Sequence, residues 1–358
     1  MTAPQAVPPE ISWFGALCDD DYEVLGVPDQ RLVSSVEHCE AIVSEADRLG
    51  FDNVLLPSGY ALGIDTVAFA AAVARTTKQI RLLVAVRAGE VWPPQLARQL
   101  ATLDHLLGGR LTINVISSDL PGESLDPGPR YQRTIETVEI IRDLLDGRST
   151  DRSGDFYDLH LDPPRVATVS GGCPPIYVGG LSEHAREMAA RVADVYLMWP
   201  DTEERVAAVV ADLRARAASH GRTLRFGYRV HVVVRETEGQ ARDAARHLVS
   251  ALDPDEGKAI RSRSLDATST GVARQAELRD LADGDGYLES VLWTGIGRAR
   301  SGCGAAIVGD PSQVATKLER YRALGMDAFI LSGYPHLDEC RRFAQLVLPL
   351  LEHAPLSI

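Results

Sequence analysis

Short apolar segments alternate with amphipathic helical segments along almost the whole chain, and this alternation restricts the fold more than any other feature of the sequence. Buried strands that follow one another through helices are parallel and are joined by right-handed crossovers. Eight strand–helix units in a chain of 358 residues match a single (β/α)8 barrel, the TIM barrel. The expected strands are residues 12–17, 53–57, 81–86, 111–117, 175–180, 195–199, 225–235 and 328–332.

Two departures from this rhythm define the expected organisation. Residues 253–304, between the seventh and eighth units, are rich in Gly, Arg and Ser, and segments of this length are usually lids or disordered loops. The first ten residues, MTAPQAVPPE, are rich in Pro and contain no apolar block, so we expect a disordered tail over 1–10. One barrel domain is expected over 11–354, with a long insertion or lid at 253–304 before the last βα unit. The alternative is an open doubly wound sheet, which is disfavoured because no G-x-G-x-x-G motif follows the first strand.

The composition excludes several classes of protein. Hydrophobic residues make up 45% and charged residues 24% of the chain, which is ordinary for a globular protein. The net charge of −13 would repel a polyanion, so we expect no nucleic-acid partner, and an anionic small substrate would need a local basic pocket. No apolar run approaches the ~18 residues of a spanning helix, so we expect no membrane partner. The five cysteines are scattered without a C-x-x-C motif, which indicates neither disulfides nor a metal site and favours a cytoplasmic protein.

In a barrel the active site lies at the C-terminal ends of the strands, and this rule selects the candidate residues. The fifth expected strand runs into Gly179 and Gly180, followed by Leu181 and Ser182, which can open a helix. Glycines let the backbone approach a ligand, and a helix N-terminus offers free N–H groups to a phosphate. The alternative is a tight turn in which Ser182 is only an N-cap.

Arg229 and His231 lie on one face of the seventh expected strand, opposite Tyr228, Val230 and Val232. A strand that is buried on both faces is normally a continuous apolar run, so an inward-facing cation and imidazole need either partners or a site. We expect an active site here, with a salt-bridged structural pair as the alternative.

Further candidates stand at or near the same rim. Tyr334 follows the eighth strand and serves a site or acts as a capping hydrogen bonder. Asn114 is polar on a buried strand and must be hydrogen-bonded. Arg298 and Arg300, in the insertion, suit a loop that closes over an anion, with a solvated basic loop as the alternative. The remaining candidates, each with a plain packing or capping alternative, are Trp199, Cys18 and His336.

Several segments can be compared with known families. The most distinctive are RFGYRVHVVVRET and SGYPHLDE, accompanied by ADRLGFDNVLLPSG, ARQLATLDHLLGGR, IYVGGLSEHA and LWTGIGRARSGCGAAIVGD. In this order, from about residue 11 to 352, the chain resembles the bacterial luciferase-like flavin monooxygenases. Within that family it resembles most the alkanesulfonate monooxygenase branch, whose members depend on FMNH2.

The resemblance implies a TIM barrel that uses reduced FMN as a diffusible cosubstrate and O2 as oxidant. It also implies a separate NAD(P)H:FMN reductase, a homodimer or homotetramer, and cleavage of the C–S bond of an organosulfonate to give an aldehyde and sulfite. By the same resemblance the catalytic residues are His231, Arg229, Tyr334, Arg300 and Trp199, and the flavin is held by Asn114, Tyr131, Gly179, Gly180, Leu181 and Ser182.

Two departures from the family's pattern concern the substrate. Residues 58–65 read SGYALGID where the family typically has TGRSCED, and Cys18 stands where the family usually has a histidine. Both lie at the expected barrel mouth, and we assign Cys18, Tyr60 and Arg298 to substrate binding. The alternatives are a monooxygenase acting on a sulfone, an amine or a biosynthetic intermediate, an F420-dependent oxidoreductase of the same superfamily, and a flavin-binding protein without turnover.

Overall fold

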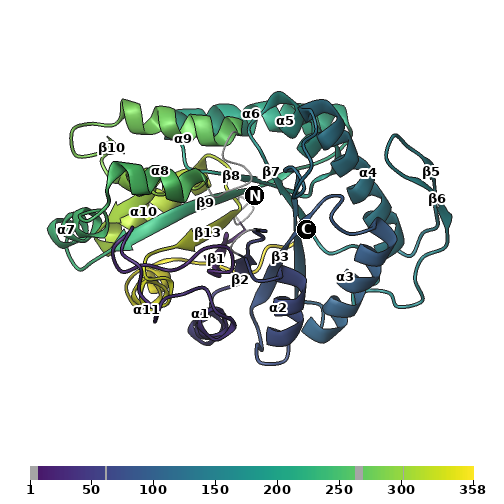
Figure 1. The fold of residues 1–358 in the computed structure, drawn as a ribbon, viewed down its shortest axis with the longest axis horizontal. Helices are drawn as coiled ribbons and strands as arrows, with labels where there is room; N and C mark the ends of the chain where they lie inside the picture. Colours follow the sequence, from purple (N-terminus) through teal and green to yellow (C-terminus); the bar gives the residue numbers. More distant parts are fainter. Residues whose placement is uncertain (1–6, 61–62, 263–268, 301) are drawn as a thin grey trace, which may run out of the picture.

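Eight parallel strands close into a barrel in the computed structural model, which describes residues 7–60, 63–262, 269–300 and 302–358. The ring closes where β13 pairs in parallel with β1, with Ile11 opposite Phe329. The helices lie outside the ring (Figure 1). The (β/α)8 prediction is confirmed and the open-sheet alternative is wrong. In order around the ring, the strands are β1 Glu10–Phe14, β2 Asn53–Leu56, β3 Arg81–Arg87, β4 Leu111–Ile116, β7 Ile176–Gly179, β8 Val195–Met198, β9 Arg225–Val234 and β13 Ala328–Ser332.

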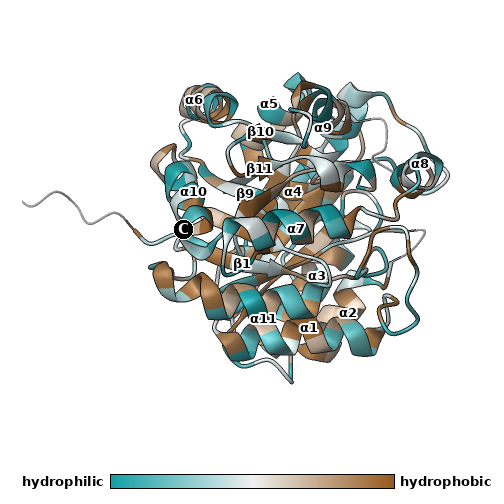
Figure 2. Ribbon diagram, turned by 90° about the vertical axis from the view of Figure 1, so that its left-hand side faces the viewer, coloured by the Kyte–Doolittle hydropathy of each residue, from teal (hydrophilic) through white to brown (hydrophobic). Residues whose placement is uncertain are grey.

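The outer helices form where amphipathic segments carry clear start and stop signals. In α1 (Val36–Leu49) the Ser35 hydroxyl accepts a hydrogen bond from the His38 N–H, and Gly50 ends the helix in the left-handed conformation at φ 87°. Surface helices such as α1 and α11 carry both hydrophilic and hydrophobic segments (Figure 2). The other helices are α2 Thr66–Val73, α3 Pro93–Leu107, α4 Pro127–Leu145, α5 Glu183–Val192, α6 Glu203–Ser219, α7 Glu238–Leu248, α10 Pro311–Ala323 and α11 His336–Leu346, followed by a 3-10 turn, Leu348–Leu350.

The insertion at 253–304 is folded where the structure describes it. β9 has ten residues and β8 only four, so the outer half of β9 extends past the barrel. β12 (Ala306–Gly309) pairs in parallel with that outer half, and β11 adds to β12. The insertion is anchored to this extended sheet. It contains α8 Pro254–Ser262, α9 Thr270–Leu281, β10 Tyr287–Glu289, β11 Leu292–Trp293 and a 3-10 turn, Gly295–Arg298.

The N-terminal end of the barrel has a polar floor. Glu10 is fully buried and accepts hydrogen bonds from the amide of Asn53 and the hydroxyl of Tyr177, each at 3.2 Å. Burial raises the pKa of its carboxyl group. Because Glu10 is part of β1, the expected tail over residues 1–10 is too long by at least this residue; residues 1–6 lie outside the described part. Above the floor the barrel is filled by Phe14, Leu55, Leu83, Tyr177, Val195, Leu197 and Ile330.

Few features lie outside this plan. β5 (Thr150–Ser153) and β6 (Asp158–Leu161) form an antiparallel hairpin. Among the described residues, no helix combines the length and apolarity needed to cross a membrane. The same residues contain no group of three or more His, Cys, Asp or Glu side chains placed to hold a metal ion.

Candidate active site

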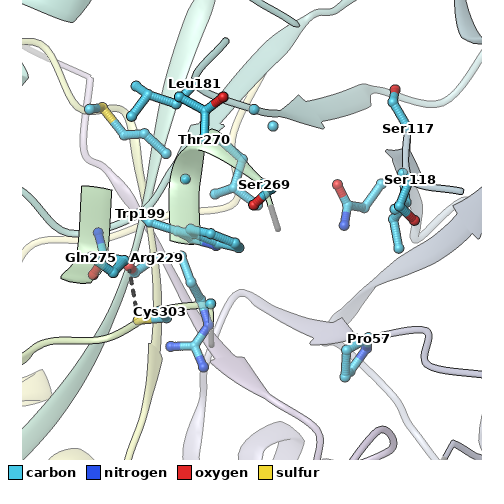
Figure 3. Close-up of a pocket in the computed structure, with 18 of the residues that line it drawn as sticks. Pro57, Ser117, Ser118, Leu181, Trp199, Arg229, Ser269, Thr270, Gln275 and Cys303 are labelled. Carbon is cyan, nitrogen blue, oxygen red and sulfur yellow. Dashed lines mark hydrogen bonds between the residues drawn. The ribbon is translucent and has the colours of Figure 1, made fainter. Parts of the chain in front are cut away.

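A cavity of about 510 Å³ opens at the C-terminal ends of the barrel strands and is called the central cavity below. Its walls come from the strand ends, from the segments that follow them and from the insertion. Figure 3 shows Trp199 and Arg229 on one side of this space and Ser117 and Ser118 on the other. A cavity of this size at this end of a barrel is the usual position of a small-molecule site.

Arg229 and His231 face into the central cavity from β9, as the alternation in the strand predicts. Both are almost fully buried, and Ser332 at the end of β13 joins them. Nη2 of Arg229 donates to Oγ of Ser332 at 2.8 Å, and the same Oγ lies 2.6 Å from Nδ1 of His231. The guanidinium also lies over the ring of Phe14, 4.3 Å from its centroid. The salt-bridged alternative is wrong, because no described carboxylate pairs with Arg229.

His231 is neutral in this environment. Burial, followed by the charges of Arg229 and Arg300, lowers its pKa well below the usual 6.5. A guanidinium can only donate, so Ser332 accepts from Arg229, and we infer that its own hydrogen is donated to Nδ1 of His231. This arrangement leaves the proton of the neutral ring on Nε2. His231 therefore does not titrate near pH 6.5.

The insertion supplies a second guanidinium to the same wall. Nη1 of Arg300 donates to Oδ2 of Asp19 at 2.6 Å, and the guanidinium lies 5.9 Å from the centroid of the Tyr334 ring. Cys303, from the same segment, donates through Sγ to the main-chain oxygen of Arg229 at 3.4 Å (Figure 3). The insertion and β9 are thus directly connected beside the cavity.

Tyr334 lies beneath this wall and is not among the residues that line the cavity. Its ring is 5.5 Å from that of His231 and 4.7 Å from that of His336, and its buried hydroxyl has no hydrogen-bond partner in the described part of the chain. Burial raises the pKa of Tyr334, so the phenol stays protonated. Nδ1 of His336 is hydrogen-bonded to Asp21 at 2.8 Å. His336 therefore not only begins α11 but also joins it to the segment after β1.

Trp199, directly after β8, is enclosed by two glycines of the insertion. A Cβ atom on Gly271 would come within 2.7 Å of the indole ring, and one on Gly302 within 3.1 Å. The indole therefore fills the contact between the barrel rim and the insertion while it lines the cavity. Glycine is required at position 271 by this close approach.

The fifth barrel unit forms a cradle at the next wall. Gly180 has φ 137°, and a Cβ atom there would lie 2.6 Å from Cβ of Ala185. Ser182 caps α5 by accepting from the Ala185 N–H, and its hydroxyl donates to that of Tyr131 at 3.2 Å. The N-cap alternative is therefore true of Ser182, but the residue also lines the cavity. Gly179, Gly180, Leu181, Ser182, Tyr131 and Asn114, all named by the resemblance, line one continuous region.

Sequence reasoning missed three arginines that line the cavity, Arg87, Arg130 and Arg274. Arg87 ends β3, is only 3% exposed and lines the central cavity. Its Nε and Nη1 atoms have no partner among the described residues, and neither do the hydroxyls of Ser117 and Ser118 on the neighbouring wall. The signal was present, because Arg87 directly follows an apolar run, at the strand end where a barrel places its active site.

The three residues assigned to substrate binding do not lie together. Cys18 lines the cavity, and burial raises the pKa of its thiol, which disfavours a reactive thiolate. Tyr60 lines the cavity and is 69% exposed. Arg298 does not line it: the side chain is exposed and donates to the Leu252 carbonyl at 3.1 Å. Its position in the 3-10 turn directs it away from the cavity, so the structure does not bring Arg298 together with Cys18 and Tyr60.

The model of the luciferase-like monooxygenase family matches residues 22–328. The chain belongs to this family. It is 62% identical over 356 residues to the sulfoquinovose monooxygenase of Novosphingobium aromaticivorans, covering 98% of each chain. It is 52% identical to that of Agrobacterium fabrum, covering 96% of this chain and 90% of the relative. A solved structure of a long-chain alkane monooxygenase has the same fold, with a TM-score of 0.78 at 18% identity over 99% of this chain and 94% of that one.

These comparisons confirm the resemblance that the sequence segments indicated and the barrel fold. They also confirm that the chain is an enzyme, a monooxygenase of this family. Cys18 and the first three residues of the divergent segment 58–65, Ser58, Gly59 and Tyr60, line the central cavity.

Proposed function

We propose that this chain is an FMNH2- and O2-dependent monooxygenase that cleaves the C–S bond of a sulfonated sugar, sulfoquinovose. The name of the two similar relatives supports this substrate. The observation that carries the proposal is one wall where the guanidinium groups of Arg229 and Arg300 meet the neutral ring of His231. Such a wall, called the anion wall below, suits a sulfonate anion.

The residues of the second wall fit reduced FMN. The positive φ of Gly180 and the free turn at the start of α5 suit a phosphate, with Ser182 and Tyr131 as hydroxyl partners. Asn114 and the unpartnered hydroxyls of Ser117 and Ser118 offer hydrogen bonds to a heteroaromatic ring. When bound, the reduced flavin supplies the electrons that activate O2.

The chain's own side chains bind and orient the substrate and keep water out of the cavity. Arg229 and Arg300 hold the sulfonate by charge-assisted hydrogen bonds. His231, with its proton on Nε2, donates a hydrogen bond at the reacting wall, and Tyr334 supplies a protonated phenol directly behind it. Trp199 and the insertion cover the cavity and exclude water, which is the lid role proposed for residues 253–304.

The reaction balances as a sulfonate R–CH2–SO3⁻, O2 and FMNH2 giving an aldehyde, bisulfite, FMN and water. One oxygen atom enters the carbon product and the other leaves as water, while the C–S bond breaks. We also propose a separate NAD(P)H:FMN reductase and a homodimer or homotetramer, which rest on the family resemblance, and a cytoplasmic location, which rests on the scattered cysteines.

The test supplies chemically reduced FMN and air and measures sulfite release from sulfoquinovose and from a linear alkanesulfonate. We expect release from the sugar sulfonate, at least a hundredfold loss in Arg229→Met, and no change in Arg98→Met, an exposed arginine on α3. Absence of sulfite from every sulfonate would reject C–S cleavage. Oxygen-independent turnover of F420 would identify a hydride-transfer enzyme, and loss of flavin binding in Arg229→Met would show that the anion wall is misplaced.

A further inference from the structure

Arg87 differs from the other arginines that line the central cavity. Each of those has a side-chain partner that the structure describes, whereas no hydrogen bond or ion pair to the guanidinium group of Arg87 is found among residues 7–60, 63–262, 269–300 and 302–358. The partnered arginines are Arg130 with Asp119, Arg229 with Ser332, Arg274 with Asp201 and Arg300 with Asp19.

A buried guanidinium without a hydrogen-bond or ion-pair partner destabilises the folded chain. Arg87 is 3% exposed, so water satisfies few of its five N–H donors. Leaving a buried charge unpaired costs several times more than leaving a neutral donor unpaired. A bound group with negative charge or strong acceptors would remove that cost. The position of Arg87 at the cavity therefore indicates contact with a ligand.

The barrel topology shows whether Arg87 lies nearer to the wall proposed for the flavin or to the wall proposed for the sulfonate. β3 and β9 are four strands apart in both directions around the ring, so Arg87 stands across the barrel mouth from Arg229. On its own side, β3 pairs with β4, where Arg87 is opposite Ile116 and Ala85 is opposite Asn114. Residues 83, 85 and 87 share the inner face, since Leu83 is part of the barrel filling. Arg87 thus stands beside the wall proposed for the flavin and opposite the wall proposed for the sulfonate.

We propose that Arg87 contacts the isoalloxazine ring and selects the reduced, anionic form of the flavin over the neutral oxidised form. Reduced flavin readily loses a ring proton near neutral pH and then carries a negative charge on the ring, whereas the oxidised ring is uncharged. A cation in a desolvated cavity discriminates between these states. The enzyme would bind the flavin it consumes and release the one it produces. This inference rests on the proposed function, because it assumes that the cavity binds FMN.

The experiment measures flavin affinity directly, without turnover. Reduced FMN is titrated anaerobically and oxidised FMN in air, each by fluorescence, against the wild-type chain and the variants Arg87→Met, Arg87→Lys and Arg98→Met. We expect Arg87→Met to lose at least tenfold in affinity for reduced FMN and less than threefold for oxidised FMN. A tenfold change in this ratio makes the two-electron potential of the bound flavin about 30 mV more negative. Arg87→Lys should keep most of the preference, and Arg98→Met all of it.

The other outcomes separate the two proposals. An equal loss of affinity for both redox forms, or no loss for either, would overturn the role of Arg87. Unchanged flavin affinities with a raised KM for the sulfonate would place Arg87 against the substrate and would also overturn it. If the wild-type chain binds neither form of FMN, the proposed function fails first. Should Arg87→Met not fold, Arg87→Gln removes the charge with less loss of polarity and carries the same expectation.

Discussion

Ser332 connects the two side chains on which the anion wall depends. Its hydroxyl accepts from Arg229 and faces Nδ1 of His231, and no part of it is exposed. Ser332→Ala leaves a buried guanidinium donor unpaired and frees the histidine tautomer. We expect kcat to fall by about 10- to 100-fold, because a hydrogen bond to a charged group is worth ~1.5–3 kcal/mol. Steady-state sulfite release measures this effect.

A purely structural role for Ser332 predicts a different pattern. In that case Ser332→Ala would lower the midpoint of urea unfolding and leave the His231 tautomer unchanged. Nitrogen NMR of the labelled imidazole distinguishes the two roles, since we expect one tautomer in the wild type and a mixture in the variant. Ser332→Thr keeps the hydroxyl group and should retain most of the activity.

The low pKa of His231 has a consequence for stability. The pKa of His231 in the folded chain lies well below 6.5. As the pH falls below about 6.5, the imidazole is therefore protonated in the unfolded chain but not in the folded chain. This contribution to stability is complete above that pH and is lost progressively below it. We expect His231→Asn, whose amide oxygen can still accept from Ser332, to lose less stability between pH 7.5 and pH 5.5 than the wild type. Equal losses in urea titrations at the two pH values would contradict the assignment.

Individual site residues were predictable from the sequence when strand alternation alone decided their direction. Arg229 and His231 face inward because every second residue of β9 does. Arg87 also faces inward, but it lies one residue beyond the strand predicted at 81–86, so alternation within that predicted strand did not include it. Arg298 and Arg300 lie two residues apart in a Gly-rich segment, and only the folded 3-10 turn decides which one reaches the cavity.

At the level of elements, the contact of α9 with Trp199 can be tested by adding a single methyl group. The Cβ atom of Gly271→Ala would come within 2.7 Å of the indole, so either α9 or Trp199 must move. We expect ~1–3 kcal/mol lower stability for the insertion and a reduced kcat/KM. Hydrogen exchange across residues 270–281 and sulfite release measure the two effects.

Gly239→Ala in α7 is the matched control. A Cβ atom there would meet nothing within 4 Å, and alanine is a better helix former than glycine. This variant should therefore be neutral or up to about 1 kcal/mol more stable, with unchanged activity. Similar behaviour of the two alanine variants would show that the insertion is not closely packed on Trp199.

The elements themselves were predictable to different degrees. β13 has the bounds that the sequence pattern predicted, because a short apolar run determines it locally. α8, α9 and β10–β12 were not found. They depend on tertiary contacts, such as the pairing of β12 with the outer half of β9 and the ion pair of Arg274 with Asp201. A single sequence carries little signal for structure that other parts of the fold must hold in place.

Across the whole molecule, binding and stability are assigned to opposite ends of the barrel. The central cavity opens at the C-terminal ends of the strands, while the other end is closed by Leu356, which belongs to the apolar filling of the barrel and is 3% exposed. The main chain of Leu356 donates to Glu10 at 3.1 Å and accepts from Arg81 at 2.6 Å. The last residues therefore join β1 and β3 at the floor, far from every group proposed to touch flavin or sulfonate.

Leu356→Ala separates these two properties. The substitution removes a buried side chain but keeps both main-chain hydrogen bonds, so we expect unfolding to cost about 2–5 kcal/mol less. The affinity for FMN should stay within twofold of the wild type at temperatures where both are folded, because the cavity wall is untouched. Ile358→Ala, at a position that is 62% exposed, should change stability by less than about 0.5 kcal/mol. A loss of FMN affinity in Leu356→Ala without a loss of stability would mean that the floor and the mouth of the barrel are mechanically coupled.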